Sequence, residues 1–227
     1  MKIEIKNVTK KIGKKIVLNN INMEFESGTI YGLKGVNGSG KTMLMRCICG
    51  LLLPTEGTVT IDGKVLGKDI SFPESVGALI ENPAFLSNET GFENLNALAS
   101  IKGEVGKERI DEVLTIVGLK DARNLKYRKY SLGMKQRLGI GAAILEKPEI
   151  LILDEPLNAL DDKGIEAVHT ILEQAKKDNQ LVIIACHDYL ELVSLTDVIY
   201  HLENGYFKGS EKSDKSILEK MGGIKNE

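Results

Sequence analysis

A cluster of glycines precedes a lysine–threonine pair at residues 35–42. The segment reads Gly-Val-Asn-Gly-Ser-Gly-Lys-Thr and fits the pattern G-x-x-x-x-G-K-[ST]. Glycines let the backbone wrap closely, so that successive N–H groups point at phosphate oxygens. Lys41 can then reach the β- and γ-phosphates of a nucleotide, and the Thr42 hydroxyl can ligate Mg²⁺. An ordinary flexible loop is the alternative. We expect phosphate binding by Gly35, Asn37, Gly38, Ser39, Gly40, Lys41 and Thr42.

Two adjacent acids follow the short apolar run Ile150–Leu153. Ligands of open α/β sheets bind at the carboxyl ends of strands, so Asp154 is placed to hold Mg²⁺ through water. Glu155 beside it could accept a proton from an attacking water. A helix cap or a turn would also explain two adjacent acids, but the glycine-rich loop upstream favours chemistry.

A histidine follows a second apolar run, Leu181–Ala185. A lone histidine is more often structural than catalytic. His187 nevertheless leaves its predicted strand at the same sheet edge as Asp154, so we expect it to contact the γ-phosphate.

Composition limits the class of protein. The 227 residues carry 30 basic and 32 acidic side chains, a net charge of −2, which gives no indication of nucleic-acid binding. No apolar stretch approaches the ~18 residues of a membrane span, and the start lacks the pattern of a signal peptide. We therefore expect a cytoplasmic protein. The three cysteines, Cys47, Cys49 and Cys186, are predicted to be buried small hydrophobes and not metal ligands.

Periodicity supplies the elements that must position these residues. Alternation predicts strands over 3–8 and 16–26, a β-rich run enters the glycine loop at 29–33, and hairpins are expected at 57–65 and 198–207. Buried strands are predicted over 150–153 and 181–185. Helices are predicted over 42–53, 92–101, 107–117, 132–145, 163–177 and 190–195. The last twenty residues are predicted to be a loosely held helix or tail. The chain is thus expected to be a single α/β domain, 1–227, with a core of 1–84 and 141–227 around a helical subdomain of 85–140.

The order of these motifs resembles the ATPase subunits of ABC transporters. Tyr130-Ser131-Leu132-Gly133-Met134-Lys135-Gln136-Arg137 is similar to their signature segment, usually written L-S-G-G-Q. Asn158-Ala159-Leu160-Asp161 looks like the D-loop, and His187-Asp188 like the switch-histidine loop. "Gly-Ala-Leu-Ile-Glu-Asn-Pro" at 77–83 narrows the resemblance to the bacitracin and lantibiotic branch, bacterial ATPases of antibiotic-peptide export and immunity.

The resemblance implies a P-loop NTPase (RecA-like) core with an antiparallel β subdomain and an inserted helical subdomain. It also implies a dimer, identical or mixed, that sandwiches two ATP molecules. Ser131, a good N-cap for the helix that follows, and Gly133 would meet the γ-phosphate bound by the opposite subunit. Asp161 would belong to the same composite site.

Three departures from the family pattern carry specific expectations. Ile12 stands where the family often has an aromatic ring stacked on adenine, so base selectivity should be weak. Glu81 replaces the glutamine that contacts Mg²⁺ and senses the transport domain, and we expect it near the metal. Leu132 and Met134 replace a glycine and a glutamine of the signature.

The resulting hypothesis is a Mg²⁺-dependent ATPase subunit at the inner face of the cell membrane. It would bind ATP, use Glu155 as base, and pair with a separate transmembrane permease that exports an antimicrobial peptide or similar hydrophobic compound, or confers immunity to it. Two alternatives are a soluble, non-transport ABC ATPase and a regulatory nucleotide-binding protein.

Overall fold

The computed structural model describes residues 1–218 and contains two sheets with helices on both sides of the larger one. The smaller sheet has the order β2-β1-β4-β5 and is antiparallel. Its strands are β1 (Lys2–Ile12), β2 (Lys15–Glu26), β4 (Glu56–Ile61) and β5 (Lys64–Val65).

The larger sheet has the order β10-β9-β3-β8-β7-β6, and all its neighbouring strands are parallel except the edge strand β10. The strands are β3 (Ile30–Lys34), β6 (Val76–Leu79), β7 (Ile150–Asp154), β8 (Leu181–Cys186), β9 (Val198–Glu203) and β10 (Tyr206–Lys212). In β7 and β8 every residue is buried, as the unbroken apolar runs predict.

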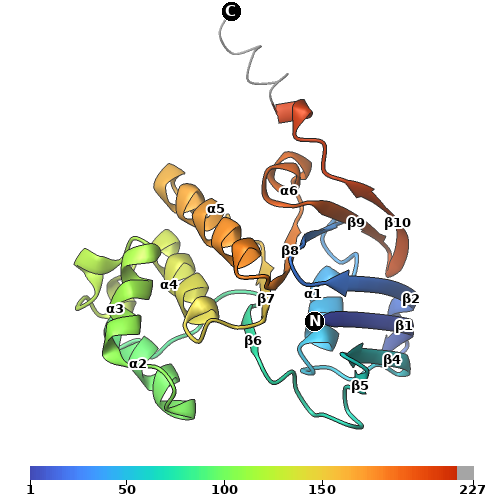
Figure 1. Cartoon of the computed structure of the whole chain (residues 1–227), viewed down its shortest axis with the longest axis horizontal. Helices are drawn as coiled ribbons and strands as arrows, with labels where there is room; N and C mark the ends of the chain where they lie inside the picture. The colour runs from blue at the N-terminus through green and yellow to red at the C-terminus, as the bar shows by residue number, and fades with distance from the viewer. Residues whose placement is uncertain (219–227) are drawn as a thin grey trace, which may run out of the picture.

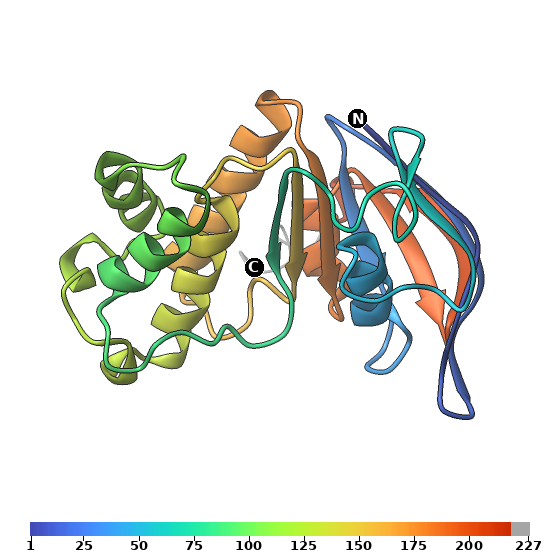
Figure 2. The ribbon, with the colours of Figure 1, turned by 90° about the horizontal axis from the view of Figure 1, so that it is seen from below.

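Helix α1 (Lys41–Ile48) lies between the two sheets, whereas the other helices lie on the opposite face of the larger sheet (Figure 1, Figure 2). These are α2 (Gly91–Lys102), α3 (Lys107–Ile116), α4 (Leu132–Ile144), α5 (Asp162–Lys177) and α6 (Tyr189–Leu195), with short 3₁₀ turns at Lys120–Ala122 and Tyr127–Lys129.

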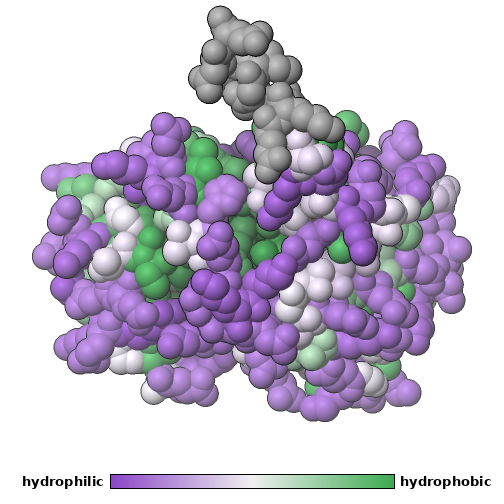
Figure 3. All heavy atoms as spheres, turned by 45° about the horizontal axis from the view of Figure 1, so that its top comes forward, coloured by the Kyte–Doolittle hydropathy of each residue, from purple (hydrophilic) through white to green (hydrophobic). Residues whose placement is uncertain are grey.

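Strand alternation divides the interior into two cores. Ile150 and Ile152 of β7 pack in the core around α1, whereas Leu151 and Leu153 pack in the core beneath the other helices. This is the two-residue period of a strand buried on both faces. Much of the face shown in Figure 3 is hydrophilic, with hydrophobic residues in separate patches. None of the helices within residues 1–218 combines the length and the apolar character that a membrane crossing requires.

Most predicted elements are confirmed, with three differences. Strand β6 was not predicted. Helix α1 ends at Ile48 and not at 53, because Gly50 adopts a φ of 73° and a Cβ there would lie 2.6 Å from the Ser71 carbonyl oxygen. The predicted loose tail is wrong for residues 208–212, which belong to β10. Its last nine residues, 219–227, lie outside the described part of the chain.

Candidate active site

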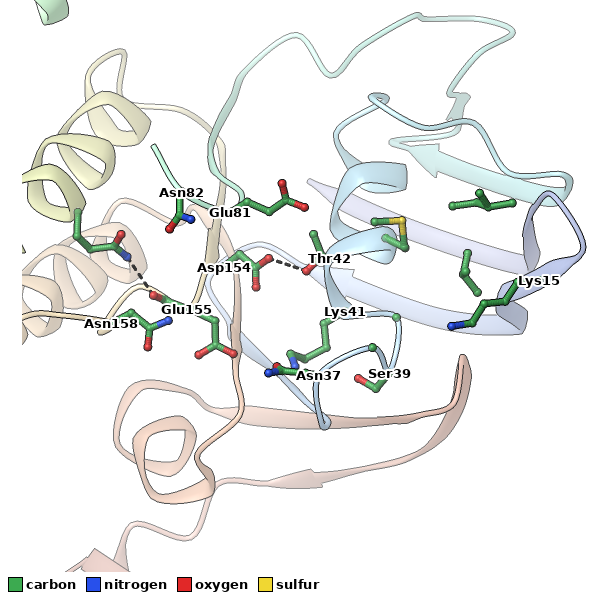
Figure 4. A pocket seen from close by; sticks show the side chains of 16 residues that line it. Lys15, Asn37, Ser39, Lys41, Thr42, Glu81, Asn82, Asp154, Glu155 and Asn158 are labelled. Carbon is green, nitrogen blue, oxygen red and sulfur yellow. Dashed lines mark hydrogen bonds between the residues drawn. The ribbon is translucent and has the colours of Figure 1, made fainter. Parts of the chain in front are cut away.

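A cavity of about 730 Å³ opens where the phosphate loop, the ends of the central strands and the β1–β2 hairpin meet (Figure 4). This volume is in the range of small-molecule sites. Sixteen residues line it: Ile12, Lys15, Val17, Asn37, Gly38, Ser39, Gly40, Lys41, Thr42, Met43, Glu81, Asn82, Gln136, Asp154, Glu155 and Asn158. Ten of the residues predicted from the sequence therefore line one cavity: loop residues 37–42, Ile12, Glu81 and both acids, whereas Gly35 and His187 do not line it.

The loop can be built only with glycine at several positions. Gly38 and Gly40 have φ values of 82° and 109°, which side-chain-bearing residues rarely adopt. Gly35 has an ordinary φ, but a Cβ there would lie 2.3 Å from the Ser39 Oγ. The turn at Gly205 packs against the loop from the other side, where its N–H donates to the Ser39 carbonyl at 2.9 Å.

Two polar groups of the loop are poised for an anion. Lys41 is almost fully buried, and its Nζ donates a hydrogen bond of 2.6 Å to the Gly35 carbonyl. The Ser39 Oγ is buried without a hydrogen-bond partner among the described residues, which usually costs stability. Helix α1 begins at Lys41 with no side-chain cap on its first N–H groups. Uncapped amides and a buried ammonium fit a phosphate group.

Thr42 and Asp154 meet at the foot of the loop, where the Thr42 Oγ1 donates to the Asp154 Oδ2 at 2.7 Å (Figure 4). Burial raises the pKa of the Asp154 carboxyl, while the Thr42 hydrogen bond acts to lower it. Oxygen donors with one buried carboxylate are the type of site that Mg²⁺ prefers, since it keeps water and substrate oxygens as its other ligands. Among residues 1–218 no three His, Cys, Asp or Glu residues cluster as a complete protein-made metal site.

Glu81 enters the cavity from the loop after β6, and its own conformation is unusual. Its φ is 62°, and its Oε1 forms an ion pair with the Arg46 Nη2 at 2.8 Å. Arg46 follows Thr42 by four residues on α1, so both side chains lie on one helix face. The carboxylate predicted to lie near the metal is thus held by a cation in this structure.

Glu155 and His187 also lie within hydrogen-bonding distance of each other. The Glu155 Oε2 lies 3.0 Å from the His187 Nδ1. This hydrogen bond and the glutamate's negative charge raise the pKa of His187. The parallel register of β7 and β8 pairs Asp154 with Ala185, which confirms that both strands deliver their polar residues to one edge.

The signature residues lie elsewhere. Ser131 caps α4, accepting a hydrogen bond of 3.2 Å from the Met134 N–H, and is exposed. Gly133 packs against the chain at 158–161, where a Cβ would lie 2.5 Å from the Ala159 carbonyl oxygen. Asp161 caps α5 through the Gly164 N–H at 3.0 Å and pairs with Arg137. None of Ser131, Gly133 and Asp161 lines the cavity.

The sequence prediction missed several cavity residues, most notably Gln136 and Lys15. Gln136 is buried on α4, where the other inward side chains are apolar or absent, and a polar residue on an apolar helix face is a signal that could have revealed it. Lys15 lines the cavity from the β1–β2 hairpin and is labelled in Figure 4. Its exposed position in a lysine-rich hairpin gave no sequence signal.

The family model described as ABC transporter matches residues 18–158. An uncharacterised ABC transporter ATP-binding protein of Bacillus subtilis, YybJ, is 51% identical over 92% of this chain and 96% of its own length. The bacitracin transport ATP-binding protein BcrA of Enterococcus faecalis is 43% identical over 90% of this chain and 67% of its own. The lantibiotic transport ATP-binding protein SrtF of Streptococcus pyogenes is 34% identical over 96% of this chain and 90% of its own length.

Solved structures agree in fold. The structure of an ATP-binding subunit of an ABC transporter superposes with a TM-score of 0.85 at 25% identity, covering 98% of this chain and 94% of that one. A dimeric ATP-binding cassette in a post-hydrolysis state with ADP and Pi gives a TM-score of 0.83 at 26% identity, covering 93% of this chain and 99% of that one.

Proposed function

The chain belongs to the ABC transporter family as an ATP-binding subunit, and from that membership we propose that it hydrolyses ATP with Mg²⁺ to drive transport of an antimicrobial peptide or a similar hydrophobic compound. The names of relatives in bacitracin and lantibiotic transport support this substrate class. Export of the compound, or immunity to it, is the expected outcome for the cell.

The proposal rests on four residues that line one cavity, Lys41, Thr42, Asp154 and Glu155, each hydrogen-bonded to a polar partner. Lys41 with its loop carbonyl, Thr42 with Asp154, and Glu155 with His187 come from three neighbouring strand ends. On ligand binding Lys41 would exchange the Gly35 carbonyl for phosphate oxygens, a stronger charge-assisted contact. The loop amides and the Ser39 hydroxyl would orient the same phosphates.

The remaining residues act on metal and water. Thr42 and Asp154 would hold Mg²⁺, which when bound supplies positive charge against the phosphate oxygens. Glu155 would take the proton of the attacking water at its carboxylate, as a general base. His187 would leave Glu155 to contact the γ-phosphate, donating a ring N–H that imidazole carries in either protonation state.

Two macromolecular partners complete the proposal. Ser131, Gly133 and Asp161 do not line this chain's own cavity, which supports a second ATPase subunit whose nucleotide they would meet. The dimeric solved cassette gives the same support. Exposed apolar residues in the segment 85–140, among them Leu86, Leu98 and Ile101, support contact between this proposed subdomain and a transmembrane permease. The subunit would then sit on the cytoplasmic face of the membrane.

Phosphate release by the purified chain tests the enzymatic part. We expect hydrolysis of ATP with Mg²⁺ and none when EDTA removes the metal. Lys41→Ala should weaken binding of an ATP analogue, measured by equilibrium titration, because it deletes a direct phosphate contact. A chain that binds ATP with Mg²⁺ but releases no phosphate, alone or with its permease, would contradict the proposal. Resistance of cells expressing chain and permease to bacitracin or a lantibiotic tests the substrate class.

A further inference from the structure

The backbone at Glu155 is held in an unfavourable conformation. Its φ is 50°, in the left-handed region that residues with a Cβ rarely adopt. Such a conformation persists only where its surroundings fix it. On one side the Glu155 N–H donates to the Ala185 carbonyl of β8 at 2.8 Å. The other side of the residue therefore needs its own support.

Part of that support is a turn hydrogen bond of 3.3 Å from the Asn158 N–H to the Glu155 carbonyl, and the rest comes from one side chain on α4. The Gln136 Nε2 donates to the Glu155 carbonyl at 3.0 Å, a bond drawn in Figure 4, and to the Pro156 carbonyl at 3.3 Å. Gln136 is 8% exposed, so water competes little for these bonds. An amide nitrogen has two N–H donors, and both are used on the backbone of the proposed base and its neighbour.

The same stretch of α4 also contacts the rest of the segment 155–161. Gly133 packs against the Ala159 carbonyl oxygen without room for a Cβ, and Arg137 pairs with Asp161. Contacts at 133, 136 and 137 therefore tie the first two turns of α4 to the chain that follows Glu155. Ser131, at the N-terminus of this helix, lies about 7.5 Å along the helix axis from Gln136.

We propose that Gln136 is a positioning residue that holds the carboxylate of Glu155 in place, and that it links this base to the signature end of α4. The inference rests on the proposed function. In a sandwich of two subunits, Ser131 would meet the partner's ATP while Glu155 faces its own. Binding at the partner's site would then move α4, and Gln136 would carry that movement to the Glu155 carbonyl.

The first test replaces only the amide. Gln136→Met keeps the length of the side chain and removes both donors. Binding of an ATP analogue to the isolated chain should change less than threefold, whereas kcat should fall roughly 10- to 100-fold, as for a misplaced catalytic group. Gln174→Met is the matched control, because the Gln174 Nε2 donates to Asp178 at 2.9 Å on the exposed face of α5. It should leave kcat unchanged.

Mixed dimers show whether Gln136→Met displaces Glu155 in its own chain or damages the signature segment that would face the partner's ATP. Lys41→Ala disables its own chain's phosphate loop. In a dimer with Gln136→Met, the only intact loop belongs to the chain whose Glu155 is misplaced, so activity should stay low. In a dimer of Lys41→Ala with Ser131→Arg, one composite site has neither defect and partial activity should return. Recovery in the Gln136→Met mixture to the level of the Ser131→Arg mixture would overturn the proposal.

The outcomes distinguish this inference from the proposed function. A normal kcat for Gln136→Met, in a chain whose Glu155→Gln variant is inactive, overturns the positioning role and leaves the ATPase proposal standing. No Mg²⁺-dependent hydrolysis by the unaltered chain overturns both. Where Gln136→Met fails to fold, Gln136→Leu removes both donors with a side chain of similar volume. It should show the same fall in kcat, and unchanged kcat in that variant would also contradict the proposal.

Discussion

Two polar regions of this molecule differ in where their side chains point. Around the phosphate loop, Lys41, Asp154 and Glu155 point into one cavity, and each has a partner that a ligand could replace. At the start of α4, the Ser131 hydroxyl caps its own helix and does not line that cavity. The first region therefore has its candidate groups together within one chain, and we propose that the second meets a second subunit.

Loss of the base should have the largest effect on the first region. Glu155→Gln preserves size but cannot accept a proton, and a general base typically contributes 10²–10⁴-fold. We expect ATP binding to persist, hydrolysis to fall by that factor, and an ATP-bound dimer to accumulate. Phosphate release and size-exclusion chromatography measure these effects. Turnover within a few-fold of the unaltered chain would show that Glu155 is not the base.

The second region should fail in a different way. Ser131→Arg should leave nucleotide binding by the single chain intact, since Ser131 does not line the cavity. It should abolish ATP-driven dimerisation and hydrolysis, because a bulky cation would block the sandwich. Partial recovery with Lys41→Ala subunits, measured across mixing ratios, would sharpen the contrast between the regions. If Ser131→Arg lowered the ATP affinity of the single chain as much as Lys41→Ala does, the proposed difference between the two regions would be wrong.

A smaller effect is expected at the base-binding end of the cavity. Ile12 is half exposed and lines the cavity without an aromatic ring. Ile12→Tyr should tighten ATP binding by up to about 1–3 kcal/mol, the range for stacking on a base. Ile16→Tyr is the control, because Ile16 is also exposed on the hairpin but does not line the cavity. Equal effects of both variants would argue against stacking at Ile12.

The smallest predicted effect is the titration of His187. The pKa of His187 is raised from 6.5 by its hydrogen bond to Glu155 and by that carboxylate's charge, with smaller contributions from Glu191 and Asp188. The stabilisation from the charged pair is therefore complete below pH 6.5 and is lost as the pH rises through the higher folded value.

An internal comparison makes this titration measurable. His169 lies on α5, and burial lowers its pKa from 6.5. NMR titration should place His187 above His169, and Glu155→Gln should lower the value of His187 alone. A pKa of His187 that is unchanged in that variant would contradict the paired geometry.

The sequence predicts best where local chemistry is decisive. The glycine pattern at 35–42 is a local signal, and the apolar runs 150–153 and 181–185 are predicted as buried strands from their length and composition. Strand β6 is different. Val76-Gly77-Ala78-Leu79 has little β-propensity, and only its parallel pairing with β7 makes it a strand. Its glycine also meets α4, since a Cβ at Gly77 would lie 1.8 Å from the Ala143 carbonyl oxygen.

The missed parts of the site depend on contacts distant in sequence. The pair of Arg46 with Glu81 and the bonds from Gln136 to the chain after β7 join elements that no local pattern connects. Sequence spacing shows that Gln136 belongs to the signature helix, but not that it faces Glu155. The roles of Ser131, Gly133 and Asp161 remain predictions, because their expected ligand belongs to another subunit.

The contact between Gly205 and Ser39 has a consequence for how the protein is made. The chain is synthesised from its N-terminus, and the phosphate loop leaves the ribosome long before residue 205 does. Until then the loop lacks the turn that packs against Ser39, and the β1–β2 hairpin lacks the hydrogen bond of 2.8 Å from the Asn19 N–H to the Gly205 carbonyl. The nascent chain therefore carries its phosphate loop without these two contacts for most of its synthesis, and they form only when the β9–β10 hairpin is made.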